Sequence, residues 1–360
     1  MRRLHWPILI TALFSVLAWN WAGEIGFGQP TSLSSASSTS ADQRSIKPDS
    51  LSAPFDEKAA KDFQKRWADY LQIQPQVSNS LGMKFALIPP GTFLMGTPDT
   101  ESGREKNEAQ HRVTLTKPFM LGIHDVTMGQ FRQFVTIENY QTDAEKLGGA
   151  ICWRDLEGRE SKKDAAANWK NPGFIQTDDH PVVCVSLNDA QQYCAWLSKK
   201  EGKVYRISTE AEWEYACRAG TQSAYPWGDR PDEGKGWANC VDLTAKEAFP
   251  QWTSFQWQDG FVYTSPVGSF KPNAFGLYDM IGNVWQWCTD WGADYPDGAA
   301  TDPVGPKQNM STRVRVLRGG AWNSGPVFSR SGVRVGDDTN GSGFNTGFRI
   351  VLDVAVPEQK

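Results

Sequence analysis

The chain has 360 residues, a length that allows either two domains or one large domain with a tail. Its 39% hydrophobic and 22% charged residues, with 16 Trp, exclude both a wholly disordered protein and a multi-span membrane protein. The net charge of -4 lacks the positive excess of nucleic-acid-binding proteins, so DNA and RNA are not expected as partners. The 33 Gly and 21 Pro indicate a loop-rich fold rather than a helical bundle.

The first residues have the order of a secretory signal. Arg2 and Arg3 precede an apolar run over residues 7–19, which is too short for a comfortable membrane span. We therefore predict a signal peptide or N-terminal anchor over residues 1–28, and an exported protein that is periplasmic, cell-surface or secreted. Membrane contact is expected only through this segment if it stays uncleaved, because the first cysteine, Cys152, is too distant to carry a lipid there.

The next segments predict a linker and then a helix. Residues 29–54 are rich in Ser, Thr and Pro and have no hydrophobic period, which is typical of a flexible linker. Residues 55–78 place Phe63 and Trp67 at helical spacing, so we expect a short amphipathic helix packed against the body, followed by a connector. β-favouring residues around a Pro-Pro-Gly-Thr turn predict a hairpin over residues 83–96.

Three further helices are marked by capping residues and apolar faces. They are predicted over residues 128–138, from Ser186 to about Lys200, and from Thr209 to Gly220. Each begins after a Ser or Thr that can accept a hydrogen bond from the first turn. These helices supply most of the regular structure that the sequence predicts.

After Gly220 the chain has only short strand-like runs between Gly, Asn, Asp and Trp residues. This pattern predicts a single α+β domain, loop-rich and low in regular secondary structure, over residues 79–353, with a tail over residues 354–360. Such a domain leaves many backbone polar groups to be satisfied by side chains, water or bound cations. Bound calcium is one natural solution.

The cysteines and histidines leave the redox state open and give no zinc site. Six cysteines in an exported chain permit disulfides, and the sequence does not choose among the pairings. In the alternative interpretation, Cys194 and Cys217 are buried free thiols on apolar helix faces. The 4 histidines do not have metal-ligand spacing.

Two clusters of hard oxygen ligands interrupt the loops. Asn239 is followed by Asp259, and Asp279 and Gln286 later flank a glycine turn. Such oxygens are the ligands that calcium prefers. On spacing alone, the alternative that these residues cap turns is favoured.

A series of motifs in chain order carries a resemblance to a known family. The series consists of Asn79–Lys84, Ile88–Gly96, Asp125–Thr127, His180–Val182, Tyr205–Tyr215, Asn273–Met280, Gly282–Trp287, Arg318–Gly320 and Gly347–Arg349. The chain resembles the formylglycine-generating enzyme family, also called sulfatase-modifying factors, from about Asn79 to Asp353. The resemblance implies a variant of the C-type-lectin-like fold that holds calcium.

The resemblance also implies two calcium positions. The first takes the side chains of Asn239 and Asp259 with the carbonyls of Cys240 and Phe261, and the second takes the side chains of Asp279 and Gln286 with the carbonyls of Gly282 and Val284. The family usually presents Asn and Glu where this chain has Asp279 and Gln286. The swap keeps the charge, so calcium is expected at both positions.

The chain departs from the family where the family's chemistry takes place. Active members oxidise a sulfatase cysteine to formylglycine with oxygen and a copper ion that two cysteines hold. The matching positions are Ser324 and Ser329, and the serine that usually follows the Gly-Gly pair is Ala321. A serine hydroxyl is hard and stays protonated at neutral pH, so it cannot replace a thiolate for Cu(I). We expect neither copper nor formylglycine-generating activity.

We interpret the chain as a calcium-stabilised binding or accessory module whose ligand is a peptide, protein or glycan. Aromatic side chains beside Arg and Asn are typical of recognition surfaces. The predicted binding surface consists of Trp285, Trp322, Asn323, Phe328, Arg330 and Arg334. Two alternatives stay open, an oxidoreductase of the same family that modifies a protein or small molecule by copper-independent chemistry, and a structural component of an envelope assembly.

Overall fold

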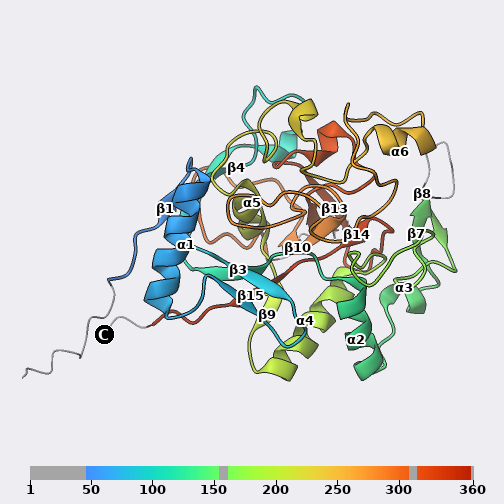
Figure 1. Ribbon diagram of the computed structural model, residues 1–360, viewed down its shortest axis with the longest axis horizontal. Coiled ribbons are helices and arrows are strands. Elements are labelled where there is room, and N and C mark those ends of the chain that lie inside the picture. The colour runs from blue at the N-terminus through green and yellow to red at the C-terminus, as the bar shows by residue number, and fades with distance from the viewer. Residues whose placement is uncertain (1–45, 154–160, 308–313, 358–360) are drawn as a thin grey trace, which may run out of the picture. The chain divides into compact units, whose positions relative to one another are not determined.

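A five-stranded antiparallel sheet joins the two ends of the described chain. The computed structural model describes residues 46–153, 161–307 and 314–357. The strand order is β2 (Gln76–Ser78), β3 (Lys84–Ile88), β6 (Phe119–Gly122), β15 (Ile350–Asp353) and β9 (Tyr205–Ile207). Because β15 lies between β6 and β9, the last strand holds the early and middle parts of the chain together (Figure 1).

The helices begin where the capping residues predict. In the described chain they are α1 (Glu57–Leu71), α2 (Met128–Glu138), α3 (Asp143–Lys146), α4 (Leu187–Glu201), α5 (Glu210–Arg218) and α6 (Leu243–Ala248). Thr127, Ser186 and Thr209 each accept the N–H of the third helical residue, whose side chain accepts the cap residue's N–H in return. These capping boxes satisfy two backbone donors at each start. The three helices predicted after residue 127 are confirmed.

Both faces of the five-stranded sheet are buried, because successive side chains in a strand point to opposite sides. Phe85 and Leu87 enter a hydrophobic cluster with residues of α1, α2 and α4. Ala86 and Ile88 enter a second cluster, which includes residues of α5. The sheet therefore separates two parts of the core.

Two further sheets and a small hairpin complete the strands of the described chain. One sheet has the order β1 (Leu51–Ser52), β4 (Gly91–Met95), β5 (His111–Leu115) and β11 (Ala300–Thr301). The other has the order β13 (Arg334–Asp338), β12 (Val314–Arg318), β10 (Trp285–Trp291) and β14 (Thr346–Gly347). The hairpin pairs β7 (Ala150–Trp153) with β8 (Ser161–Asp164). The predicted hairpin over residues 83–96 is instead divided, since β3 and β4 belong to different sheets.

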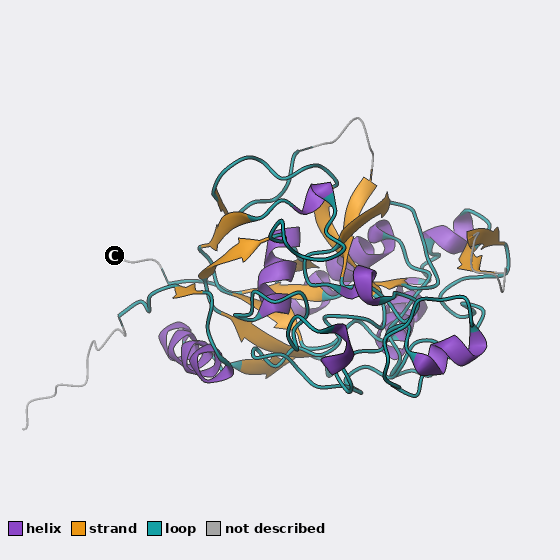
Figure 2. Ribbon diagram, turned by 90° about the horizontal axis from the view of Figure 1, so that it is seen from above, coloured by secondary structure: helices purple, strands orange, loops and turns teal. Residues whose placement is uncertain are grey.

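Loops run between these elements throughout the molecule (Figure 2), and side chains hold them. Asn273 is an example, because its Oδ1 accepts the N–H groups of Phe275 and Leu277 while its Nδ2 donates to the carbonyls of Ala216 and Cys217. One buried amide thereby satisfies four backbone groups in a segment without regular structure. The predicted α+β, loop-rich class is confirmed.

The predicted linker ends too late, because its last residues belong to the domain. Leu51, 6% exposed, and Ser52 pair with Gly91 and Thr92 in a parallel ladder. The carbonyl of Asp49 accepts the indole N–H of Trp67 in α1 at 3.2 Å. Composition alone does not reveal this pairing, because the partner strand lies far along the chain. The predicted signal or anchor over residues 1–28 lies outside the described residues.

Helix α1 is part of the core rather than an attachment to it. Trp67 is 1% exposed, and Gln64 donates to the carbonyls of Leu87 at 2.8 Å and Phe275 at 3.0 Å. The predicted domain start at residue 79 is therefore too late. Within the described ranges, none of the helices has the length and apolar character that a bilayer span requires.

We expect a chain that begins at Asn79 to lose its near-UV circular dichroism, whereas one that begins at Ile46 keeps it. The shorter chain lacks β1, α1 and β2 and exposes the apolar face of β3. In the full chain, Trp67→Ala should lower the free energy of unfolding by about 3–5 kcal/mol. Lys65→Ala, on the exposed side of the same helix, should change it by less than about 0.5 kcal/mol. A cooperative melt of the Asn79 chain would contradict this boundary.

Candidate functional site

Ser324 and Ser329, which the resemblance assigns to the family's copper positions, lie in the loop between β12 and β13. We call this loop the serine turn. The N–H of Ala321 donates to Ser324 Oγ at 2.9 Å, and the N–H of Ser324 donates to the Ala321 carbonyl at 2.8 Å. Ser329 ends a short 3-10 helix, Pro326–Ser329. Ser324 is 5% exposed and Ser329 is fully buried. The hydroxyl of Ser324 is thus engaged in closing the turn.

The backbone conformation at the start of this loop requires glycine at two consecutive positions. Gly319 and Gly320 have φ of 97° and 74°, in the left-handed region that favours glycine. A Cβ at Gly320 would lie 2.8 Å from the carbonyl oxygen of Phe328. The pair therefore lets the backbone approach the serine-bearing segment closely.

A thiol lies beside the second serine. Ser329 Oγ is 3.4 Å from Cys240 Sγ, 3.1 Å from the Gly325 carbonyl and 3.3 Å from the Ser324 carbonyl. Burial raises the pKa of the Cys240 thiol well above its usual range, so it stays protonated. One neutral thiol and two hydroxyls do not form the pair of soft thiolates that holds Cu(I). The sequence placed Cys240 at a calcium position and missed this thiol contact.

Four of the described cysteines are free. Cys194, Cys217, Cys240 and Cys288 are buried thiols, and Cys184 is also buried. Of the two interpretations that the sequence left open, the structure supports buried free thiols for Cys194 and Cys217. They serve as small apolar side chains within the core.

Most of the predicted binding surface is buried, so that prediction is wrong in its main part. Trp285 is 8% exposed and Trp322 is 2% exposed, and both belong to hydrophobic clusters. Arg330 and Arg334 are also buried. Phe328, by contrast, is 54% exposed. The remaining member, Asn323, is half-buried.

The buried arginines are held by carboxylates from distant parts of the chain. Arg330 Nη1 lies 2.6 Å from Glu101 and 2.9 Å from Glu108, and its Nη2 reaches the other oxygen of Glu108 at 2.9 Å. Arg334 makes a bidentate pair with Glu210, at 2.8 and 2.7 Å. The sequence does not show such pairs because the partners are more than a hundred positions away. These guanidinium groups are therefore not available to a ligand.

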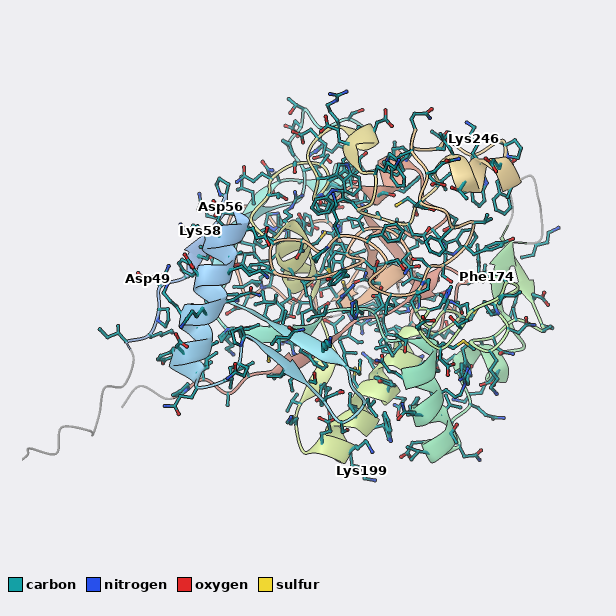
Figure 3. The ribbon with its side chains drawn as sticks, in the orientation of Figure 1. Asp49, Asp56, Lys58, Phe174, Lys199 and Lys246 are labelled. Atoms are coloured by element: carbon teal, nitrogen blue, oxygen red, sulfur yellow. The ribbon has the colours of Figure 1, made fainter. Side chains whose placement is uncertain are left out.

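Trp322 is the centre of an aromatic group that reaches the surface. Its ring lies 5.0 Å from that of Tyr263 and 6.1 Å from that of Trp252, measured between centroids. Tyr263 stacks on Phe174 at 4.7 Å and is 38% exposed. Phe174 lies on the same side of the molecule as α6, far from α1 (Figure 3). No local pattern in the sequence predicts this grouping, because Phe174, Tyr263 and Trp322 lie far apart in the chain.

The residues at the first calcium position fit a hard cation. Asn239 is 1% exposed, and its Oδ1 has no hydrogen-bond partner while its Nδ2 donates to the Tyr263 carbonyl at 2.8 Å. Asp259 accepts the N–H of Cys240 at 3.2 Å and that of Phe261 at 2.7 Å. An orphaned amide oxygen next to a carboxylate is the type of site that a calcium ion satisfies.

A second carboxylate adds negative charge at this position. Asp242 is fully buried and accepts the backbone N–H of Asp259. Burial, with Asp242 as a like charge, raises the pKa of Asp259. In the described chain no group of three or more His, Cys, Asp or Glu could hold a metal, so a site here depends on amide and carbonyl oxygens. Asp242 follows Asn239 closely in the sequence and could have been proposed from it.

The second calcium position does not offer the side-chain oxygen that it needs. Gln286 Oε1 accepts the indole N–H of Trp213 at 2.8 Å and the Nε–H of Arg349 at 3.1 Å. These two donors fix the amide, whose Nε2 donates to the Asp279 carbonyl at 2.8 Å. The carbonyl of Gly282 accepts the Val284 N–H at 2.9 Å. The Gln286 and Gly282 oxygens are thus used within the protein, whereas Asp279 Oδ1 has no hydrogen-bond partner.

A guanidinium supplies positive charge at this second position. Arg349 Nη2 lies 3.5 Å from Asp125 Oδ1, and Asp279 Oδ2 accepts the Gly268 N–H at 2.7 Å. Burial raises the pKa of Asp125 to about 7 and that of Asp279 to about 6, although Arg349 acts to lower both. The second position therefore fits calcium less well than the first, because Gln286 is engaged and the Arg349 guanidinium acts on Asp279.

Comparisons with known proteins agree with this geometry. The family described as Sulfatase-modifying factor enzyme 1-like domain matches residues 72–354. The chain belongs to this family. It is 36% identical to the formylglycine-generating enzyme of Thermomonospora curvata, over 74% of this chain and 92% of that protein. It is 33% identical to the Bos taurus formylglycine-generating enzyme over 75% of each. The resemblance found in the sequence is confirmed.

Two other relatives bear on fold and activity. The structure of PvdO from Pseudomonas aeruginosa is similar with a TM-score of 0.62 and 33% identity, covering 77% of this chain and 97% of that one. The fold is therefore the C-type-lectin-like variant of the formylglycine-generating enzyme family. The Mus musculus protein named Inactive C-alpha-formylglycine-generating enzyme 2 is 34% identical over 76% of this chain and 86% of that protein. The family thus includes relatives named as enzymes and relatives named as inactive.

We expect Arg330→Met to lower the free energy of unfolding by about 3–5 kcal/mol, because it leaves the buried carboxylates of Glu101 and Glu108 without a partner. Arg132→Met is the matched control, since its pair with Asp178 is solvent-exposed and should contribute less than about 1 kcal/mol. Urea unfolding followed by tryptophan fluorescence measures both. Equal effects of the two substitutions would contradict the assignment of Arg330 as a buried anchor.

Proposed function

We propose that this chain is an exported accessory module of the formylglycine-generating enzyme family that binds a ligand and does not generate formylglycine. The observation that carries the proposal is the presence of Ser324 and Ser329 at the two copper positions. Ser324 Oγ accepts a backbone N–H, and Ser329 Oγ lies within hydrogen-bonding distance of two carbonyls and a protonated thiol. Copper-dependent oxygen activation has no ligand pair here. The relative named inactive supports this interpretation.

The export part of the proposal rests on the sequence. Arg2 and Arg3 before the apolar residues 7–19 have the charge and length of a secretory signal. The protein would then act in the periplasm, at the cell surface or in the medium.

We place the ligand over an aromatic surface defined by Phe174, Trp252 and Tyr263, which gather around Trp322. Tyr263 is exposed, and Phe174 and Trp252 are half-buried. The backbone beside Trp252 approaches the serine turn, because a Cβ at Gly325 would lie 2.6 Å from the Thr253 carbonyl. Aromatic faces with little conformational freedom suit recognition of a peptide or a glycan. This surface replaces the mostly buried set that the sequence predicted.

Calcium at the first position would stabilise the module. The ion would be held by the side chains of Asn239 and Asp259 with the carbonyls of Cys240 and Phe261, and it would offset the negative charge of Asp242. The same segment carries Cys240, which contacts Ser329. Calcium would therefore fix the loop that lies against the serine turn, without taking part in a reaction.

The full chain should leave a sulfatase-type Cys-x-Pro-x-Arg peptide unchanged when copper, oxygen and reductant are supplied. Mass spectrometry of the incubated peptide measures the outcome, and the Thermomonospora curvata enzyme is the positive control. Conversion of the thiol to an aldehyde would overturn the proposal. Another oxidised product of the peptide would instead favour the copper-independent oxidoreductase.

Restoring both thiols tests whether the copper positions are assigned correctly. The variant Ser324→Cys with Ser329→Cys should bind Cu(I), whereas the unmodified chain, which has only the Cys240 thiol there, should not, because two soft ligands are needed to retain the ion. Copper content after desalting measures this. Absence of bound copper in the folded double variant would show that the two positions do not face a common ion.

Excess calcium should raise the melting temperature, and chelation should lower it, because an ion that binds only the native state stabilises it by about 2.7 kcal/mol at a hundredfold excess over Kd. Asp259→Asn should remove the response, since it takes away the only carboxylate among the proposed ligands. Asp279→Asn should keep it, because Gln286, the other side-chain ligand of the second position, is already engaged by two donors. Identical melts in chelator and calcium would contradict the site.

A further inference from the structure

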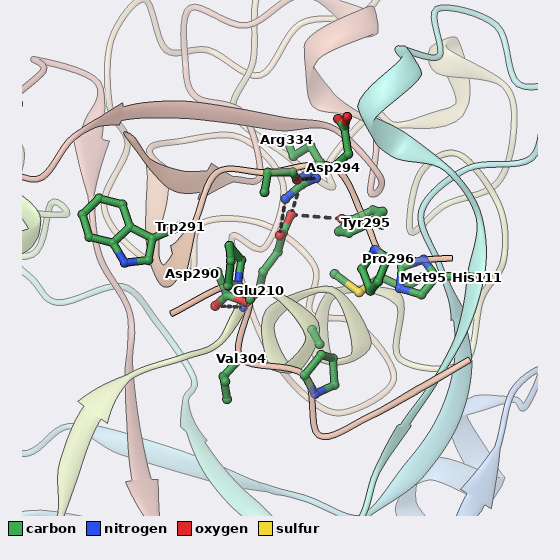
Figure 4. A pocket seen from close by; sticks show the side chains of 15 residues that line it. Met95, His111, Glu210, Asp290, Trp291, Asp294, Tyr295, Pro296, Val304 and Arg334 are labelled. Carbon is green, nitrogen blue, oxygen red and sulfur yellow. Dashed lines mark hydrogen bonds and ion pairs between the residues drawn. The ribbon is translucent and has the colours of Figure 1, made fainter. Parts of the chain in front are cut away.

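A cavity of about 370 Å³, to which the serine turn contributes no residue, lies where two sheets and α5 meet (Figure 4). Its walls come from the end of β4, the start of β5 and of α5, the end of β10, the loops over residues 293–296 and 303–306, and β13. This volume is within the range of sites that hold small molecules. Neither the family's copper positions nor the calcium positions contribute a residue to it.

One carboxylate in the cavity is fully engaged. Glu210 accepts two N–H groups of Arg334, at 2.8 and 2.7 Å, and the hydroxyl of Tyr295 at 3.0 Å. Arg318 Nε lies 3.5 Å from the same carboxylate. Arg334 also donates to the carbonyls of Asn107 and Ala293. Because four of the five N–H donors of Arg334 are engaged and Glu210 lies beside it, an anionic ligand is disfavoured there.

The cavity contains a second carboxylate, Asp290, of which only one oxygen accepts hydrogen bonds from described residues. Asp290 is 4% exposed, and its Oδ2 accepts the Glu210 N–H at 2.8 Å and the Thr289 hydroxyl at 3.3 Å. Within the described ranges, Asp290 Oδ1 receives no hydrogen bond and Asp290 makes no ion pair. The Arg315 guanidinium attracts Asp290 electrostatically, but it stacks 3.5 Å over Trp291 and donates its hydrogen bond to the Thr289 carbonyl.

The charge of Asp290 is therefore poorly compensated. Burial, with Glu210 as a nearby like charge, raises the pKa of Asp290 to about 7. A cation bound at Asp290 Oδ1 would offset the unfavourable free energy of burying this negative charge. Asp294, an exposed residue of the cavity wall, adds a second negative charge to the cavity. The field in the cavity thus attracts a cation.

The rest of the wall suits an apolar body. Met95, Pro303, Val304 and Pro306 line it, and the ring of His111 lies 4.6 Å from that of Tyr295. A metal ion would need about six oxygen ligands, whereas Asp290 offers one free oxygen among apolar side chains. An ammonium group needs one charge-assisted hydrogen bond and tolerates carbon around its stem.

We propose that this cavity is a binding site for a primary ammonium group carried on an apolar stem, with Asp290 Oδ1 as the anchor and Asp294 at the rim. The shared chemistry can come from a free alkyl or aryl amine, or from a lysine side chain of a protein. The site is independent of the aromatic surface and the serine turn.

Isothermal titration of the full chain with 2-phenylethylamine tests the proposal. We expect saturable binding, with 2-phenylethanol, its neutral analogue of similar shape, binding at least about tenfold more weakly. Titration with Nα-acetyl-lysine amide distinguishes the two sources, because tighter binding of this compound indicates a protein lysine, and tighter binding of phenylethylamine indicates a free amine. Equal affinity for the amine and the alcohol, or no binding of either amine up to about 10 mM, would overturn the proposal.

Two variants and a control locate the site. Asp290→Asn should reduce affinity for the amine about tenfold or more, and it should fold because the amide oxygen still accepts the Glu210 N–H. Val304→Trp should block binding by filling the cavity, at a residue that is 66% exposed and tolerant of size. Asp297→Asn removes an exposed carboxylate from the same loop that does not line the cavity, and should leave affinity unchanged. An unchanged affinity in Asp290→Asn, or in Val304→Trp, would refute this location.

Discussion

A buried network of ion pairs around α5 holds the parts of this fold that matter for function. Glu214, which is fully buried, accepts N–H groups from Gly96, Arg218 and Arg318. Glu210, one turn earlier, pairs with Arg334. Each charge is desolvated, so each requires its partner, and removal of one partner costs more than a surface pair would contribute. A single short helix is thereby fixed to β4, β12 and β13.

The network also determines where the serine turn lies. Arg318 immediately precedes the Gly319–Gly320 turn, and Arg334 begins the strand that follows the turn. Between them, Arg330 is anchored by Glu101 and Glu108. The segment that in active relatives carries copper is therefore held at both ends and in the middle by charges that do not depend on a metal. The scaffold can persist when the thiols are replaced by serines.

Buried amide side chains also hold the loops in place, through hydrogen bonds to several groups at once. Asn273 and Gln286 each join several groups, and Gln286 connects Trp213 of α5 to Arg349 near the last strand. Where such contacts are complete, as at Gln286 Oε1 of the second calcium position, the amide oxygen is not available to an ion. Where one is missing, as at Asn239 Oδ1, a cation can complete the set. The same reasoning separates Glu210, whose partners are complete, from Asp290, whose partners are not.

The sequence by itself determined the elements that depend on near neighbours. Thr127, Ser186 and Thr209 marked helix starts because a capping box is closed within four residues. The motif series identified the family, and the identity of Ser324 and Ser329 led to the proposal that the copper ligands are absent, because both steps depend only on which residue stands at a position. The α+β, loop-rich class followed from composition and periodicity for the same local reasons.

Only the tertiary structure decided which polar and aromatic residues are available. Arg330, Arg334 and Trp322 have the composition of a recognition surface, yet distant carboxylates and rings bury them. Leu51 joins the domain through a strand some forty positions away. Cys240 meets Ser329, and Asp290 lies open to a cavity, through contacts between segments that are far apart in the chain. Burial and charge pairing are properties of these long-range contacts, and no local pattern in the sequence specifies them.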